Sequence, residues 1–387
     1  MNKKHILILL AGGELSINLK PTGGIFMLNQ AKLLSQNNFK VSVISTGLHS
    51  INHFFARKDY PEVEKLNNLT IYRKYTQHFF INRYTPFEYL KAIHWKLSHK
   101  LFKKYITIEG LPDIIHSHNI LYSGFCADQI FKKYNIPYLI TEHSSDYFNH
   151  YSLDFLKKVP ELIKNTSGLF TVSKKNSITL KSKLNIAKVG VIPNIVSKEF
   201  EYFERKGLKK DNRIFNFIIV ANLIKIKNIF LALDSFRILL KTQKDVHLKI
   251  IGEGPEKNLI KQYINQNNLS KHVSLMGRLS QLKVKDEYYK SDCLIVTSHY
   301  ETFCNVIIEA MMCGLKVIST DVGIANEVIN NNNGIVIDKD SVSLKNAMNR
   351  ILELKNKHER YHIHQQIKKD FSQKNLMTQL LEHYEKI

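Results

Sequence analysis

Short apolar runs that alternate with longer helical patterns constrain the fold of this chain more than any other feature of its sequence. Each run is bounded by turn residues, and the runs fall at 6–11, 41–46, 114–116, 138–141, 169–172, 215–221, 248–251, 273–276, 293–297, 317–320 and 334–337. Continuous apolar strands separated by helices are typical of parallel sheets that helices cover. The sequence therefore predicts two doubly wound α/β sheets, one in each half of the chain.

The length and a break in this rhythm predict two domains. A chain of 387 residues exceeds one ordinary core, and a strand ends at residues 191–194. The following stretch, 197–213, is charged and poor in aliphatic residues, which is typical of a linker. We expect a first domain over residues 1–195 and a second over 196–370. The terminal segment, 371–387, could pack back on the first domain.

Composition narrows the class of protein. Hydrophobic residues make up 44% and charged residues 23%, as in a folded soluble protein. The net charge of +22 predicts a surface that attracts nucleic acid, anionic lipid or phosphorylated substrates. The four cysteines show no Cys-x-x-Cys spacing, so neither a disulfide framework nor a zinc site is indicated.

The apolar run that follows Lys3 and Lys4 resembles a signal peptide, but it is too short. No run approaches the roughly 18 apolar residues that cross a bilayer. We therefore expect a cytoplasmic protein and leave open peripheral contact with the inner face of the plasma membrane.

The strongest chemical signal lies in the segment 292–314, which reads as a strand, a loop and a helix that a glycine ends. Glu301 falls on the loop, where ligands bind in open α/β sheets. If the helix begins at Asn305, its free amides favour a phosphate, and Glu309 lies one turn inside on the same face. The two carboxylates could hold the ribose diol and the sugar hydroxyls of a nucleotide sugar.

These residues resemble the retaining glycosyltransferases of family four, a GT-B fold group whose donor lobe carries two glutamates separated by seven residues. Residues 251–255 and 321–327 are similar to two glycine-containing segments of that family, and the resemblance covers most of the chain. It implies two Rossmann-like domains that face across a cleft, the first binding the acceptor and the second the nucleotide-sugar donor. The donor-binding residues that it implies are Gly23, Gly24, Asn222, Lys227, Gly252, Glu301, Phe303, Cys304, Asn305 and Glu309.

The chain departs from the family pattern at three of its positions. Cys304 and Ile324 stand where the family usually has glycine, which could narrow the loop or change its conformation. Asn222 replaces an arginine that would hold the donor diphosphate beside the matching Lys227, and Lys225 could supply part of the missing charge. Alternatively, these lysines are solvated residues at a helix start.

Four strand ends of the first domain carry candidate residues. Gly23 and Gly24 could bring backbone amides close to a phosphate, or form a plain turn. His116 and His118 would point to one side of a strand end, although a metal chelate there would lack a third ligand. The resemblance implies that His118 lies beside the transferred sugar, and we expect His116 to be structural. Candidates for acceptor contacts end the later strands at Glu142, His143 and Ser173.

The resemblance also implies transfer with retention of anomeric configuration and without an enzyme nucleophile, because the donor would occupy both glutamates. In a front-face displacement the leaving diphosphate would take the acceptor proton, while Lys227, the Asn305 helix start and the Gly23 loop stabilise its charge. We assign the reaction to His118, Lys227 and Glu301. We expect no metal and no cofactor beyond a nucleotide sugar linked to UDP or GDP.

The expected function is transfer of a hexose-type sugar to a saccharide or lipid-linked acceptor in cell-envelope or capsular polysaccharide synthesis. Two alternatives remain: another GT-B enzyme such as a nucleotide-sugar epimerase or phosphorylase, or a non-catalytic binder of sugar nucleotides. Residues 89–104 form a basic helical pattern that could rest on anionic lipid or pack on the core with a solvated face. No recognised nucleic-acid motif accompanies the charge, so we expect no nucleic-acid partner.

Overall fold

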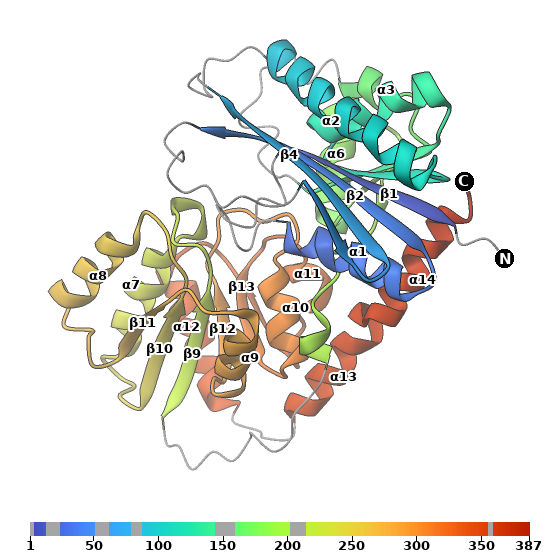
Figure 1. The fold of residues 1–387 in the computed structure, drawn as a ribbon. Helices are drawn as coiled ribbons and strands as arrows, with labels where there is room; N and C mark the ends of the chain where they lie inside the picture. Colours follow the sequence, from blue (N-terminus) through green and yellow to red (C-terminus); the bar gives the residue numbers. More distant parts are fainter. Residues whose placement is uncertain are drawn as a thin grey trace. The chain divides into compact units, whose positions relative to one another are not determined.

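The computed structural model describes residues 4–12, 24–50, 62–78, 87–143, 159–201, 214–354 and 359–387. The chain forms two compact units (Figure 1). Unit 1 comprises Met1–Ile195 together with Leu376–Ile387, and unit 2 comprises Val196–Asn375. The C-terminal residues therefore belong to the same unit as the N-terminal half of the chain. Most of the predicted linker, 202–213, lies outside the described residues.

Unit 1 holds an eight-stranded sheet in the order β3-β4-β2-β1-β5-β6-β7-β8. The strands are β1 (His5–Ala11), β2 (Lys40–Ser50), β3 (Val63–Leu66), β4 (Leu69–His78), β5 (Ile114–His118), β6 (Tyr138–Glu142), β7 (Gly168–Thr171) and β8 (Gly190–Val191). All neighbours run parallel except the edge pair of β3 and β4. β1 pairs with both β2 and β5, so the strand order reverses between β1 and β5.

Helices cover both faces of this sheet. α2 and α3 lie on one face, and α1 and α14 lie on the other (Figure 1). The helical segments of the unit are α1 (Ile25–Gln36), α2 (Phe87–Glu109), the π-helical turn η2 (Ile120–Gly124), α3 (Phe125–Tyr134), α6 (Lys174–Leu184) and α14 (Gln373–Tyr384). Because both faces are covered, strands such as β1 and β5 are buried along their whole length.

Unit 2 holds a six-stranded parallel sheet in the order β11-β10-β9-β12-β13-β14. Its strands are β9 (Phe215–Val220), β10 (Val246–Ile251), β11 (Val273–Gly277), β12 (Cys293–Val296), β13 (Lys316–Thr320) and β14 (Gly334–Ile337). Its helices are η3 (Lys198–Glu201), η5 (Lys225–Lys227), α7 (Ile229–Leu239), α8 (Lys257–Gln266), α9 (Gln281–Tyr289), α10 (Asn305–Met312), α11 (Ala325–Val328), α12 (Ser341–Glu353) and α13 (Glu359–Phe371). In this sheet the strand order reverses between β9 and β12.

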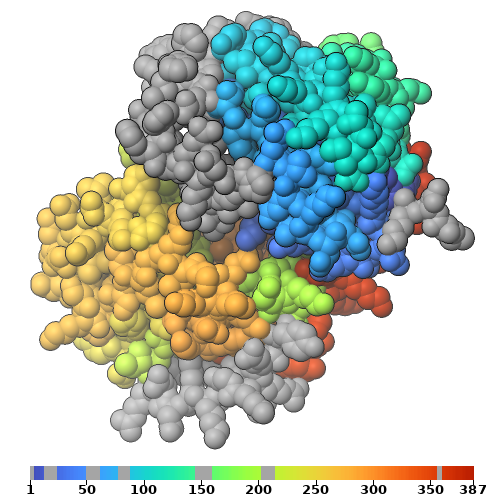
Figure 2. Space-filling model, in the orientation of Figure 1, coloured from blue at the N-terminus to red at the C-terminus, as the bar shows by residue number. Residues whose placement is uncertain are grey.

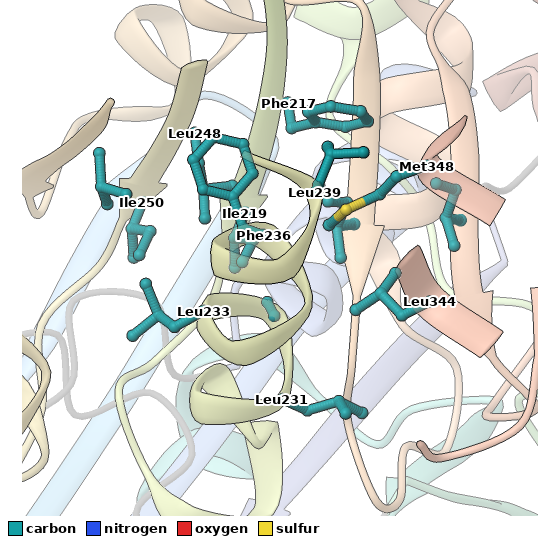
Figure 3. Packing of buried hydrophobic residues seen from close by; sticks show 14 of the residues in the cluster. Phe217, Ile219, Leu231, Leu233, Phe236, Leu239, Leu248, Ile250, Leu344 and Met348 are labelled. Carbon is teal, nitrogen blue, oxygen red and sulfur yellow. The ribbon is translucent and has the colours of Figure 1, made fainter. Parts of the chain in front are cut away.

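The core of unit 2 shows why its strands are continuous apolar runs. Alternate residues of β9 and β10 point toward α7 and α12, while the residues between them, such as Ile218, are buried on the opposite face. Figure 3 shows the side chains that meet on the α7 face: Phe217, Ile219, Leu231, Leu233, Phe236, Leu239, Leu248, Ile250, Leu344 and Met348. This packing fixes the strand ends from which the candidate site residues extend.

The two doubly wound sheets confirm the predicted fold class, and each predicted strand forms within a few residues of its expected bounds. The sequence pattern missed β3 and β4, whereas the strand expected to end at 191–194 forms as β8. β4 lies beside the edge strand, and polar residues such as Thr70 and Lys74 interrupt the apolar run that marks a central strand. Within the described segments, none of the helices combines the length and apolar character that a membrane span requires.

Candidate active site

The loops that leave the carboxyl ends of β9 and β12 are bonded to each other at the point where the strand order reverses. Thr297 Oγ1 donates to the carbonyl of Lys227 over 2.9 Å. The His299 amide donates to the carbonyl of Ile226 over 2.8 Å. The side chains of Lys227 and Glu301 form an ion pair between the same two loops. Because open α/β sheets bind ligands at such a reversal, this pair marks the candidate donor site.

The ion pair fixes the charge of Lys227. Burial alone would lower the pKa of this lysine, but the Glu301 carboxylate raises the pKa above its ordinary value. Glu301 Oε1 also accepts a hydrogen bond from Ser298 Oγ over 2.8 Å. Both donors bind Oε1, so Oε2 can accept a hydrogen bond from a ligand hydroxyl. The sequence reasoning missed Ser298, although it stands three residues before Glu301 in the same motif.

Glu309 lies in the second turn of α10, one turn after the first helical residue, Asn305. The residue as a whole is partly buried. Desolvation raises the pKa of Glu309 to about 7, although the nearby Tyr288 hydroxyl opposes this shift. A carboxyl with this pKa changes its charge near neutral pH, when its hydrogen-bonding role changes from acceptor to donor and acceptor. Sequence reasoning did not identify Tyr288, which approaches Glu309 from α9.

Cys304 immediately precedes α10 and adopts a left-handed backbone conformation, with φ 72° and ψ 66°. The expectation that this position favours glycine therefore has a conformational basis, because side chains disfavour positive φ. Burial raises the pKa of the Cys304 thiol well above its ordinary value, so the thiol is neutral and a poor nucleophile. Ile324 has φ −89°, an ordinary value, so its side chain imposes no such strain.

Gly323, beside Ile324, takes the conformation that needs glycine. Its φ is +53°, and an added Cβ would lie 2.4 Å from the Phe303 carbonyl oxygen. That oxygen also accepts a hydrogen bond from the Ile324 amide over 3.0 Å. The Phe303 side chain is buried and packs edge-on against Phe371, so it supports the loop from inside unit 2.

Gly252 brings the loop after β10 against the loop after β9. A Cβ at Gly252, where φ is +152°, would lie 1.8 Å from the Ala221 carbonyl oxygen. The Leu223 amide also donates to the Glu253 carbonyl over 2.9 Å. Gly252 thus shapes the segment that carries Asn222 and Lys227. The Asn222 side chain is exposed there, and its contact with a donor stays a prediction.

Unit 1 brings three histidines together near the carboxyl ends of β5 and β6. The rings of His116 and His118 stack with centroids 4.7 Å apart, so both point to one side of β5 as expected. His118 Nδ1 lies 2.7 Å from His143 Nε2, a hydrogen bond between the two rings. Burial lowers the pKa of His116 and of His143 to about 3, and that of His118 well below its ordinary value. All three imidazoles are therefore neutral at physiological pH.

The other candidates of unit 1 have structural contacts. The buried Glu142 carboxylate accepts a hydrogen bond from the Ile120 amide over 2.8 Å, at the start of η2. Ser173 is buried at the N-cap of α6, where its hydroxyl accepts from the Asn176 amide. Gly24 is the N-cap of α1 with φ 69°, which explains the glycine there. Gly23 lies outside the described residues, and acceptor contacts by Glu142, His143 and Ser173 stay predictions.

A resident metal ion would need several ligating side chains at one place. Within the described part of the chain, no group of three or more His, Cys, Asp or Glu side chains could hold a metal ion. The four cysteines are buried and free, with no disulfide between them. The short distance between His118 and His143 corresponds to a hydrogen bond.

Comparison with known proteins identifies the family. The family model described as glycosyl transferases group 1 matches residues 199–368, and that of glycosyltransferase family 4 matches residues 23–200. The chain is 30% identical over 275 residues to the uncharacterized glycosyltransferase MJ1178 of Methanocaldococcus jannaschii, an alignment of 68% of this chain and 70% of that protein. The chain belongs to the glycosyl transferases group 1 family. The resemblance inferred from the sequence is thereby confirmed.

Other members of this glycosyltransferase family match over different lengths. The "Putative teichuronic acid biosynthesis glycosyltransferase TuaC" of Bacillus subtilis is 26% identical, with 86% of each chain aligned. The GPI3 component of phosphatidylinositol N-acetylglucosaminyltransferase from Saccharomyces cerevisiae is 26% identical over 64% of this chain and 57% of that protein. These matches make the chain a glycosyltransferase.

Solved structures assign this glycosyltransferase to the GT-B fold. Sucrose-phosphate synthase from Thermosynechococcus elongatus superposes with a TM-score of 0.79 at 19% identity, covering 99% of this chain and 98% of that one. Anabaena HepE in complex with UDP superposes with a TM-score of 0.74 at 17% identity, covering 99% and 100%. At these identities the likeness concerns the fold.

Proposed function

We propose that this chain is a retaining, metal-independent glycosyltransferase that moves a hexose-type sugar from a nucleoside diphosphate to a saccharide or lipid-linked acceptor. The observation that carries the proposal is the ion pair of Lys227 and Glu301 where the strand order of unit 2 reverses. A lysine beside a carboxylate suits a nucleotide sugar, because the lysine can bind the anionic diphosphate and the carboxylate can accept hydrogen bonds from the hydroxyls of the sugar. The start of α10 adds free backbone amides to the same loop.

Each donor residue has a role in this proposal. The ammonium of Lys227 and the amides at Asn305 stabilise the diphosphate as it leaves. Glu301 Oε2 accepts from hydroxyls of the transferred sugar, and the Glu309 carboxylate accepts from the ribose diol. The bond from the anomeric carbon to the diphosphate breaks while the acceptor oxygen bonds to that carbon on the same face. The acceptor proton passes to a diphosphate oxygen, so the step balances without an enzyme nucleophile.

His118 contacts the transferred sugar in this proposal. Its neutral ring can form a hydrogen bond with a sugar hydroxyl without placing a full positive charge beside an oxocarbenium-like state. Lys227 and the backbone amides at Asn305 stabilise the negative charge of the leaving diphosphate, so the proposed mechanism needs no metal ion.

The relatives guide the choice of substrates. HepE was solved with UDP and glucose, which makes UDP-linked hexoses the first donors to test, with GDP-linked hexoses next. The name of TuaC refers to teichuronic acid, and that of the yeast relative to phosphatidylinositol. These names support an envelope polysaccharide or a lipid-linked saccharide as the acceptor.

Donor turnover tests the proposal directly. The protein is incubated with UDP- and GDP-hexoses, with and without lipid-linked saccharides, and the released nucleoside diphosphate and product are measured. We expect acceptor-dependent release and a product with the donor's anomeric configuration by NMR. Release of no nucleoside diphosphate with any hexose donor would refute transfer, and an inverted product would refute retention.

Two variants and a matched control locate the site. Glu309→Gln should raise the donor KM by about tenfold, because it weakens hydrogen bonds that donor and transition state share. Lys227→Ala should lower kcat by roughly 100-fold, because the charge it stabilises develops during transfer. Lys241→Ala removes an exposed lysine of the same unit and should change neither constant. Kinetics unchanged in both site variants would exclude this site.

A further inference from the structure

A hydrogen-bond network connects the C-terminal helix to the interior of unit 1. The Tyr384 hydroxyl of α14 lies 2.6 Å from His116 Nδ1, although the two residues are 268 positions apart. Gln30 Nε2 of α1 lies 3.0 Å from the same nitrogen. On the opposite side of the ring, His116 Nε2 lies 2.8 Å from Thr141 Oγ1 of β6. All four side chains are buried, with exposed fractions of 4% or less.

This network determines where His116 carries its proton. The amide nitrogen of Gln30 can only donate, so His116 Nδ1 accepts. Nδ1 is then unprotonated, the Tyr384 hydroxyl donates to it as well, and the proton resides on Nε2, which donates to Thr141 Oγ1. Burial holds the pKa of His116 at about 3, so the ring keeps a single proton. A ring with fixed donors and acceptors on both edges has one orientation.

The oriented ring of His116 supports His118. The two rings are nearly parallel, with an interplanar angle of 11° and centroids 4.7 Å apart. The other face-to-face neighbour of His118 is His143, whose ring centroid lies 4.9 Å away and whose Nε2 bonds to His118 Nδ1. His118 Nε2 is buried and has no hydrogen-bond partner among the described residues. One ring nitrogen of His118 is thus held, and the other is left for a ligand.

We propose that Tyr384 and Gln30 are positioning residues for glycosyl transfer, because they fix His116, and His116 in turn fixes the ring that presents His118 Nε2 to the transferred sugar. This inference rests on the proposed function of His118. It assigns α14, at the far end of the sequence, a role in the reaction beyond covering the sheet. Tyr384 itself touches no reacting atom.

Tyr384→Phe tests the proposal, because it removes the hydroxyl and keeps the aromatic ring that packs edge-on against His116. We expect kcat for transfer to fall by about tenfold, the effect of one lost hydrogen bond on a reacting geometry, with an unchanged donor KM. Gln30→Leu removes the second donor and should act in the same direction. Glu382→Ala changes an exposed residue of the same helix and should leave both constants unchanged.

Nitrogen NMR provides a readout that does not depend on activity. In protein labelled with 15N-histidine, with resonances assigned by His116→Gln and His118→Gln, we expect His116 to be protonated on Nε2. In Tyr384→Phe, the His116 nitrogen shifts should change and the His118 shifts should change with them. A purely structural role for Tyr384 would lower the melting temperature and leave the His118 shifts and kcat unaltered.

The outcomes separate this inference from the proposed function. If transfer occurs but Tyr384→Phe retains full kcat and unchanged His118 shifts, the positioning role is refuted and the proposed function stands. If no donor is turned over, the proposed function fails, and the tautomer of His116 with the response of His118 still decides whether the network exists. Protonation of His116 on Nδ1 in the unmodified protein would overturn the inference.

Discussion

Glu309 is the residue in the candidate donor site whose charge changes within the physiological pH range. Desolvation raises the pKa of its carboxyl to about 7, while the pKa of Lys227 is raised by its ion pair with Glu301. Lys227, the proposed partner of the diphosphate, therefore keeps its charge near neutrality, and Glu309, the proposed partner of the ribose, does not. We therefore expect the pH dependence of donor binding near neutrality to come from Glu309.

Donor affinity should weaken as the pH falls below about 7. If the Glu309 carboxylate accepts the ribose hydroxyls, protonation weakens these hydrogen bonds, and the donor Kd should rise as the pH falls and level off at about tenfold, the effect expected for Glu309→Gln. Above the pKa, the Kd should be constant. Calorimetry with an intact nucleotide sugar measures this, because its phosphates do not titrate in this range. The same curve in Glu309→Gln would assign the titration to another group.

Gly252 offers a test of backbone geometry at the site. Gly252→Ala should lower the free energy of unfolding by roughly 3 kcal/mol or more, because the added Cβ would lie 1.8 Å from the Ala221 carbonyl oxygen. Gly277→Ala is the control: it shares a positive φ, +70°, but meets only the end of the Glu253 side chain. We expect about 1 kcal/mol from its backbone strain alone. Denaturant unfolding compares the two, and equal effects would contradict the close approach at Gly252.

At the scale of elements, side chains of α13 form hydrogen bonds with the C-terminal ends of α9 and α10, the helices that carry Tyr288 and Glu309. The Arg360 guanidinium donates to the carbonyls of Tyr288 and Ser291 at the end of α9, and to that of Gly314 after α10. His364 Nδ1 lies 2.6 Å from the Met312 carbonyl oxygen at the end of α10. These carbonyls lie in or just beyond the last turn of each helix, where intrahelical donors become scarce. α13 thus holds α9 and α10 at their C-terminal ends.

Arg360→Ala should loosen these two helix ends. Loss of the charged donor leaves several carbonyls unsatisfied, and we expect a destabilisation of about 3 kcal/mol. Amide hydrogen exchange of residues 281–291 and 305–314 should increase, while exchange in β1 and β5 of unit 1 stays the same. Arg350→Ala, an exposed arginine on α12, should change neither quantity. Unaltered exchange at both helix ends would show that α13 is dispensable for holding them.

The elements themselves were largely predictable, for a physical reason. A central parallel strand such as β9 is buried on both faces, so its sequence is a continuous apolar run that composition reveals. β3 and β4 pair at the sheet edge, where β3 is partly exposed to solvent, and their mixed sequence carries no comparable signal. β8 has two residues, and the sequence marked only the end of this strand, at 191–194.

At the scale of the whole molecule, α2 carries one cluster of the basic residues that give the chain its positive charge. The inward face of this helix packs on the core of unit 1 through Leu101, Phe102 and Tyr105, which are buried. The outer face, at the surface of unit 1 in Figure 2 (cyan), carries exposed lysines at positions 96, 100, 103 and 104. Any membrane contact by this face is therefore electrostatic, and its strength should depend on salt.

Vesicle flotation tests that contact. We expect the protein to float with anionic vesicles at low salt, to remain unbound with neutral vesicles, and to be released by high salt. Replacing the four α2 lysines by serine should weaken binding by roughly 1 kcal/mol per lysine. A control of equal charge replaces four exposed lysines of unit 2, at positions 241, 244, 261 and 271, and should bind as the parent does. Equal binding to neutral and anionic vesicles would refute the electrostatic contact.

The sequence by itself determined the two sheets, the family and the motif residues Glu301, Glu309 and Lys227. These signals are local: an apolar run, a loop and a helix start each lie within about twenty residues. It also indicated that Cys304 occupies a backbone position suited to glycine, and the φ of 72° bears this out. The role of Ile324 was overestimated, because the residue that needs positive φ is its neighbour Gly323.

Only the tertiary structure decided which distant residues act together. Tyr384 and Gln30 meet at His116 across most of the chain length, and Ser298 and Lys227 meet at one oxygen of Glu301. Neither meeting leaves a periodic trace in the sequence, because a hydrogen bond constrains two atoms and leaves the intervening residues free. The histidines at strand ends were visible as single residues, and their fixed protons and shared stack came from packing.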